Sequence, residues 1–205
     1  MAGMDPEVFE QFIDQLKRYV RERLIPAEAD VIANDLIPAD IVDEMREMGL
    51  FGITIPEEFG GAGMSISQYI ETVKQLSYAA PAYRSTMSIN VGMTGSAIRK
   101  FGTPEQKAHW LPRIASGEIA CFGLTEPGSG SDSAAMQTMA TRSGNGYVLN
   151  GTKRYITNSP HAKIGLIMAR TSREALPKNA HVSAFIVNMD TPGITIGTPD
   201  KKMGQ

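Results

Sequence analysis

The chain has 205 residues, of which 42% are hydrophobic and 20% are charged, and its formal net charge is −2. These values are typical of a globular chain long enough for one large or two small domains, and they argue against the basic face of a nucleic-acid-binding domain. The apolar runs are too short for a membrane-spanning helix, and the first residues lack a secretory signal. The single cysteine, Cys121, cannot form an intrachain disulfide, which favours a reducing compartment.

The first predicted helix begins at Asp5 and Pro6, which are typical of an N-cap and a first-turn proline. Apolar residues then recur at three- and four-residue steps as far as Leu24, so they share one helix face. A second helix is predicted to open at Pro38 and to stop at Gly49, because glycine commonly ends a helix.

Two further helix starts have the spacing of a capping box, in which a hydroxyl and a glutamine three residues later satisfy each other's backbone amides. Ser65 with Gln68 predicts a third helix that ends at about residue 78. Thr103 with Gln106 predicts a fifth helix, and between them a fourth is predicted over 82–100.

The pattern changes after Gly117 to short β-type runs bounded by turn residues. Asn145-Gly146 and the Asn-Gly pair at 150–151 are the strongest turn signals, and the polar stretch 171–181 is predicted to be a loop. Helices followed by strands predict an α+β chain with a helical domain over 1–117 and a β-domain over 118–205, with the latter incomplete because its last strand lacks a partner. The predicted strands cover residues 119–124, 136–141, 147–149, 154–157, 164–169, 182–187 and 194–196.

The most informative segment follows the first predicted strand and reads Gly-Leu-Thr-Glu-Pro-Gly-Ser-Gly-Ser-Asp over residues 123–132. Gly128 and Gly130 permit positive φ and close approach of a ligand to the backbone. The small residues around them leave N–H groups and hydroxyls available to an anion. On pattern alone, a flexible surface turn explains the segment equally well.

Residues 125–132 resemble the signature of the acyl-CoA dehydrogenase family. A second block, Leu-Asn-Gly-Thr-Lys-Arg-Tyr-Ile-Thr-Asn over 149–158, resembles another conserved block of the same family at about the expected distance. Residues 55–61, 101–107 and 110–112 resemble its flanking segments, so the resemblance covers essentially the whole chain. Residues 82–88, 121–124 and 158–160 are most similar to the glutaryl-CoA dehydrogenase branch.

The resemblance implies a helical N-terminal domain, a barrel-like middle β-domain, and a C-terminal helical domain that this chain lacks. It also implies a bound FAD. Thr125 would hydrogen-bond the pyrimidine edge of the flavin, and Thr157 would donate to N5, the atom that accepts hydride. Tyr155 stands where most relatives have tryptophan. For both threonines the alternative is an ordinary choice of β-forming residue. The cofactor-binding residues implied are Phe122, Leu124, Thr125, Gly130, Ser131, Tyr155, Ile156 and Thr157.

The resemblance also implies where the acyl-CoA substrate is bound. In the glutaryl-CoA branch the arginine that matches Arg84 binds the distal carboxylate of the substrate, which a guanidinium fork suits. Ser85 and Ser131 are the other predicted substrate contacts, and an ordinary surface arginine is the alternative for Arg84. The glutamate base of the family lies in the C-terminal domain, so no catalytic residue is assigned here. The three histidines lack ligand-like spacing, and no metal site is predicted.

The implied function is α,β-dehydrogenation of an acyl-CoA thioester, in fatty acid or amino acid catabolism, with electrons passed to an electron-transferring flavoprotein. We expect the full-length enzyme to be a homotetramer in a bacterial cytoplasm or a matrix-like compartment, and this chain to be inactive alone. An acyl-CoA oxidase or a flavin monooxygenase on the same scaffold is an alternative. A non-catalytic flavin-binding or interaction fragment is another, and the charge of −2 argues against a DNA-binding relative.

Overall fold

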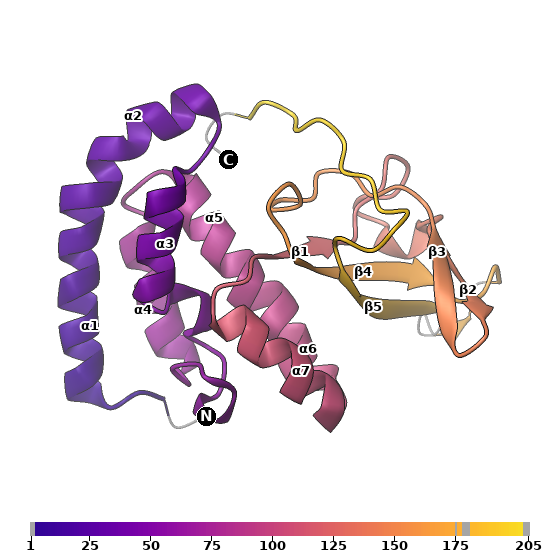
Figure 1. The fold of residues 1–205 in the computed structure, drawn as a ribbon, viewed down its shortest axis with the longest axis horizontal. Helices are drawn as coiled ribbons and strands as arrows, with labels where there is room; N and C mark the ends of the chain where they lie inside the picture. The colour runs from indigo at the N-terminus through magenta and orange to yellow at the C-terminus, as the bar shows by residue number, and fades with distance from the viewer. Residues whose placement is uncertain (1–2, 175, 178–180, 203–205) are drawn as a thin grey trace. The chain divides into compact units, whose positions relative to one another are not determined.

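The computed structural model describes residues 3–174, 176–177 and 181–202. The chain divides into two compact units: the first comprises the residues up to Ile119 together with those from Pro199 onward, and the second runs from Ala120 to Thr198 (Figure 1). The described helices of the first unit precede the described strands of the second, so the predicted order of an α part and a β part is confirmed. The predicted loop over 171–181 falls partly on residues 175 and 178–180, which lie outside the described residues.

The first unit begins with a helix at the predicted position. Helix α1 (Pro6–Tyr19) is capped by Asp5, whose carboxylate accepts from the amides of Glu7 and Val8. It continues through a π-helical segment (Val20–Leu24) into α2 (Ile25–Asn34), so the helical chain extends ten residues beyond Leu24, the last residue of the apolar pattern. The wider π turn precedes Pro26, whose ring would clash with the carbonyl four residues earlier in a regular helix.

The predicted caps of the other helices are confirmed. Helix α3 (Ala39–Glu47) follows Pro38, and Gly49 adopts φ 69° just beyond its end. Both capping boxes form, before α4 (Ile66–Leu76) and before α7 (Pro104–Ala115). Two short 3₁₀ turns, Leu50–Gly52 and Glu57–Phe59, lie between α3 and α4.

The predicted fourth helix is continuous but not regular. It consists of α5 (Pro81–Ser88), a second π segment (Ile89–Gly95) and α6 (Ser96–Phe101). A Cβ at Gly95 would lie 2.9 Å from the carbonyl oxygen of Asn90, so the backbone passes too close there for a larger residue.

One hydrophobic cluster holds the first unit together. It takes residues from the successive helices and from the 3₁₀ turn after α3, and most of them are fully inaccessible to solvent. Burial of this apolar surface is the main stabilising contribution to such a unit. The fully buried side chains of this cluster include Leu16, Leu24, Ile41, Met45, Leu50, Phe51, Leu76, Tyr83 and Met87.

The second unit contains a mixed five-stranded sheet built around β4 (Figure 1). Strand β4 (Ile164–Arg170) pairs in parallel with β1 (Ala120–Gly123) and antiparallel with β5 (Val182–Asn188). At its far end it also meets β2 (Met139–Ser143), which forms a hairpin with β3 (Gly146–Asn150). Four of the seven residues of β4 are buried and the other three are half-buried, as its continuous apolar run predicts.

Three β predictions are wrong. Residues 154–157 form no strand, because Tyr155 and Asn158 adopt left-handed φ values of 59° and 71° that break an extended ladder. Residues 194–196 are exposed and unpaired in the sheet. The β2–β3 turn is Gly144-Asn145, one residue earlier than predicted, with the positive φ of 56° at Gly144.

Candidate functional site

The glycine- and serine-rich loop leaves the end of β1 and is held by its own hydrogen bonds. The amide of Glu126 donates to the carbonyl of Ser129 at 3.0 Å, and the amide of Ser129 donates back at 3.2 Å. The Ser129 hydroxyl donates to the carbonyl of Asp132 at 2.8 Å. Because these contacts close the loop on itself and bury Ser129, the loop has a defined conformation and is not a flexible turn.

The two central glycines of this loop do not use the positive φ that glycine permits. Neither Gly128 nor Gly130 adopts a positive φ. A Cβ at either position would meet no atom within 4 Å, so the side of the loop at these residues is open. Ser131, which follows them, is exposed. The loop therefore presents backbone and hydroxyl groups without bulk, although its glycines are not required by backbone conformation here.

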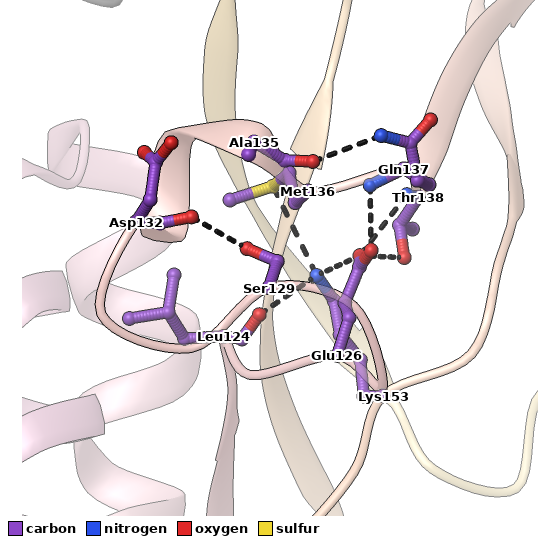
Figure 2. Close-up of polar contacts among 9 residues, drawn as sticks. All are labelled: Leu124, Glu126, Ser129, Asp132, Ala135, Met136, Gln137, Thr138 and Lys153. Atoms are coloured by element: carbon purple, nitrogen blue, oxygen red, sulfur yellow. Dashed lines mark hydrogen bonds and ion pairs between the residues drawn. The ribbon is translucent and has the colours of Figure 1, made fainter.

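The carboxylate of Glu126 points from this loop into a buried polar cluster (Figure 2). It accepts hydrogen bonds from the amides of Gln137 at 2.5 Å and Thr138 at 3.0 Å, and also from the Thr138 hydroxyl. The Nζ of Lys153 lies 2.7 Å from its Oε1. Four donors thus converge on one carboxylate, which satisfies its lone pairs in a buried position.

These contacts fix the charge state of Glu126. Burial raises the pKa of the Glu126 carboxyl, but the hydrogen bonds from Gln137, Lys153 and Thr138 outweigh this effect and lower the pKa to about 2. A carboxylate with so low a pKa is a weak proton acceptor. Glu126 is therefore a structural anion of this loop and not a candidate for the catalytic base.

Lys153 connects the two sequence blocks. Its ammonium donates to the carbonyl of Leu124 at 3.1 Å as well as to Glu126, and its side chain is only 10% exposed (Figure 2). The next amide, that of Arg154, donates to the carbonyl of Thr125 at 2.9 Å. At the other end, the Asn158 side-chain amide donates to the carbonyl of Ala120 at 3.0 Å. The second block therefore runs beside β1 and the start of the loop.

The residues between these two anchors form an exposed turn. Tyr155 has a left-handed φ of 59°, and its side chain is 63% exposed under the guanidinium of Arg154, which lies 4.9 Å from the ring centroid. Thr157 is exposed and Ile156 is half-buried. Non-glycine residues with a positive φ are strained and concentrate at ligand sites, and Tyr155 combines such a backbone with an exposed ring.

The structure therefore places the predicted cofactor residues in one unit. Phe122, Leu124 and Thr125 are half-buried at the end of β1 and just beyond it, next to the segment that carries Tyr155 and Thr157. Arg84 and Ser85 lie in α5 of the first unit, where Arg84 is half-buried and Ser85 is buried.

The pairing of Glu126 with Lys153 was not predicted from the sequence. A signal was present, because each block contains an acidic or basic residue among mostly neutral ones and the two blocks were expected to converge. Elsewhere, the described residues contain no cluster of three or more potential metal ligands. No described helix has both the length and the apolarity to cross a membrane.

A helical unit followed by a mixed sheet, with the two sequence blocks held side by side after the first strand, defines the class of fold: a helical N-terminal domain and a middle β-domain. Residues 6–118 match the family model "Acyl-CoA dehydrogenase, N-terminal domain", and residues 121–205 match "Acyl-CoA dehydrogenase, middle domain". The chain belongs to the acyl-CoA dehydrogenase family.

Similar proteins support this assignment. The chain is 38% identical to the human mitochondrial short-chain specific acyl-CoA dehydrogenase over 97% of its length and 48% of that protein. It is 37% identical to a glutaryl-CoA dehydrogenase from Mycobacterium smegmatis, with a TM-score of 0.85 over 97% of this chain and 50% of that one. A second structure of a glutaryl-CoA dehydrogenase from that organism, in complex with FADH2, has a TM-score of 0.85 at 32% identity, over 97% of this chain and 50% of that one. The chain spans about half the length of the curated relatives it matches.

Proposed function

We propose that this chain holds one side of an FAD in an enzyme that dehydrogenates an acyl-CoA thioester between Cα and Cβ. The observation that carries the proposal is the alignment of the two blocks, in which the Arg154 amide donates to the Thr125 carbonyl. This contact brings the segment of Thr157 beside the segment of Thr125, as a shared flavin requires. Family membership and the FADH2 complex of a similar protein support the same cofactor.

The described residues fit the chemistry of FAD. A diphosphate group binds to N–H and O–H donors that it can approach closely. The backbone at the open side of Gly130 and the hydroxyl of the exposed Ser131 offer such donors. A flavin ring needs partly exposed apolar surface, which Phe122, Leu124 and Ile156 provide. The exposed ring of Tyr155 adds a flat apolar face.

Each threonine has a distinct role in this proposal. Thr125 would hydrogen-bond the pyrimidine edge of the flavin, and Thr157 would donate to N5. A donor at N5 stabilises the negative charge that develops on the ring during reduction. Bound FAD supplies the acceptor for the hydride that leaves Cβ of the substrate.

The base that removes the α-proton is proposed to lie outside these 205 residues. In the family it is a glutamate of the C-terminal helical domain, and this chain spans about half of its relatives. Glu126 does not replace it, because its pKa of about 2 makes its carboxylate a poor proton acceptor. We therefore expect no acyl-CoA dehydrogenation by the 205-residue chain alone.

The proposed substrate is a short acyl-CoA whose distal carboxylate is bound by Arg84. Relatives named for short-chain and glutaryl substrates are both similar to the chain, and a half-buried arginine is suited to a carboxylate because its fork donates two parallel hydrogen bonds. Ser85 and Ser131 are the other proposed substrate contacts. The full enzyme would be a homotetramer that passes electrons to an electron-transferring flavoprotein.

Titration of the purified 205-residue chain with FAD tests the cofactor assignment. We expect saturable quenching of flavin fluorescence and a change in the visible flavin spectrum, neither of which riboflavin should match, because riboflavin lacks the diphosphate. Lack of any FAD binding by both this chain and the full-length protein would overturn the proposal. Acyl-CoA dehydrogenation by the 205-residue chain would overturn the assignment of the base to another segment.

A further inference from the structure

The ammonium of Lys153 lies among three groups of the first block and its continuation. Its Nζ is 2.7 Å from the Glu126 carboxylate, 3.1 Å from the Leu124 carbonyl and 3.9 Å from the sulfur of Met136 (Figure 2). Its side chain is 10% exposed and that of Glu126 is 4% exposed. A charge with so little access to water depends on these partners, so this lysine cannot leave them without a large loss of interaction.

Glu126 is fixed independently of Lys153. Its carboxylate accepts from the amides of Gln137 and Thr138, which lead into β2, and this holds the acid in place at the start of the loop. The carboxylate therefore joins three stretches of chain that are distant in sequence: the loop, the approach to β2, and the second block. Lys153 provides the contact that includes the second block.

We propose that Glu126 and Lys153 are positioning residues that form a buried charged latch, which holds residues 153–158 against residues 124–126. The latch fixes the distance between the Thr125 and Thr157 segments. This consequence for the flavin rests on the proposed function, whereas the latch itself does not.

The other contacts between the blocks are weaker in kind. The hydrogen bonds from the Arg154 amide to the Thr125 carbonyl and from the Asn158 side chain to the Ala120 carbonyl join neutral groups, and the turn between them is largely exposed. Hydrogen bonds that involve ionised groups are stronger and shorter than neutral ones, especially when buried. The turn also contains two non-glycine residues at positive φ, a conformation that persists only where the surroundings enforce it. The latch is the contact suited to enforce it.

The first test measures amide hydrogen exchange in the 205-residue chain without flavin. Lys153→Met replaces the unbranched aliphatic stem of the lysine with a similar apolar chain and removes the ammonium. We expect exchange of the Arg154 amide to accelerate at least about tenfold more than exchange of the β4 and β5 amides, because local opening around residues 153–158 adds to the lower stability of the unit as a whole. Lys163→Met is the matched control, because it makes the same change at an exposed lysine of the same unit.

The second test measures FAD binding and the flavin spectrum. We expect Lys153→Met to raise the FAD dissociation constant about tenfold, the scale seen when groups that orient ligand-binding residues are removed, and to shift the visible absorption bands. The double variant Glu126→Gln/Lys153→Met removes both charges. It should recover part of the unfolding midpoint lost in Lys153→Met but not the FAD affinity, a separation that a purely structural role would not produce.

Exchange that accelerates most at residues around 153–158 supports the latch. An unchanged Arg154 amide in Lys153→Met, or an acceleration spread evenly over the second unit, overturns it. If the unsubstituted chain binds no FAD, the exchange result still decides the latch, and the failure belongs to the proposed function. If FAD affinity recovers together with stability in the double variant, the positioning role is overturned.

Discussion

The ammonium of Lys153 lies 2.7 Å from a carboxylate oxygen of Glu126, although 27 positions separate the two residues in the chain. Both side chains are almost fully buried. The pair can therefore form only when the loop after β1 and the segment after β3 are folded together. Its geometry links the stability of the second unit to the arrangement of its proposed cofactor segments.

Lys153→Met should strongly destabilise the second unit. Removing one partner of a buried ion pair leaves the other charge unpaired, which typically costs about 3–5 kcal/mol. Chemical denaturation followed by circular dichroism and by fluorescence would measure the loss. Lys163→Met should change the unfolding free energy by less than about 0.5 kcal/mol, because it alters an exposed position. Equal effects of the two substitutions would contradict the role assigned to the pair.

The stability contributed by Glu126 should disappear in acid. Its pKa is about 2 in the folded chain against a usual 4.5, so the folded state favours the ionised form. This contribution is fully present above about pH 4.5 and is lost as the pH falls toward 2, with ~3 kcal/mol as its upper magnitude. The difference in unfolding free energy between the unsubstituted chain and Glu126→Gln should therefore shrink over that window.

Denaturant titrations at a series of pH values would test this dependence. Glu174→Gln provides the control, because Glu174 is exposed and in the same unit. A difference between Glu126→Gln and the unsubstituted chain that stays constant from pH 5 to pH 2 would show that Glu126 does not titrate as its contacts require.

Local sequence signals predicted the helix starts well, because each depends on a few neighbouring residues. Asp5, Ser65 and Thr103 all cap helices through side-chain oxygens, as their spacing to following residues indicated. Strand β4 was also predictable, because a short continuous apolar run bounded by turn residues is typical of a strand that is covered on both faces. The convergence of the two blocks came from family resemblance rather than from periodicity.

The features that the sequence did not reveal depend on contacts between distant residues. The chain continues as a helix through Pro26, because the wider π turn before it accommodates the proline ring, whereas a proline inside a helical pattern ordinarily indicates a helix end. The turn at Tyr155 was predicted as a strand, since its β-forming residues outweighed a φ that tertiary contacts impose. The Glu126–Lys153 pair was missed because charged residues in blocks that resemble a cofactor site were interpreted for their chemistry and not for a structural contact.

Thr157→Val should slow flavin reduction in the full-length enzyme more than it weakens FAD binding. Valine keeps the branched shape and removes only the hydroxyl, so a donor to the reduced ring is lost while packing is retained. Loss of such a donor typically costs about a hundredfold in rate. Thr125→Val should instead weaken FAD binding by about 1 kcal/mol, because its hydroxyl is proposed to contact the pyrimidine edge in every redox state.

Stopped-flow reduction with a saturating acyl-CoA, together with FAD titration, separates these two effects. Thr141→Val is the matched control, because Thr141 is an exposed threonine of β2 outside both blocks. Equal rates for Thr157→Val and Thr141→Val would remove Thr157 from the proposed flavin contacts.

Arg84→Ala should discriminate between substrates in the full-length enzyme. If its guanidinium binds a distal carboxylate, the fall in kcat/KM for glutaryl-CoA should correspond to about 1–3 kcal/mol of lost transition-state binding. The kcat/KM for butyryl-CoA, which has no second carboxylate, should be nearly unchanged. Arg84→Lys should restore only part of the loss, because an ammonium cannot donate the paired hydrogen bonds of the planar fork.

Arg142→Ala controls for loss of positive charge, because Arg142 is exposed on β2 and lies outside the residues proposed to bind substrate. It should leave both substrates unchanged. Equal losses of kcat/KM for glutaryl-CoA and butyryl-CoA in Arg84→Ala would mean that Arg84 stabilises the fold of α5 or binds the thioester portion that both substrates share. The choice of substrate would then have to lie with residues outside this helix.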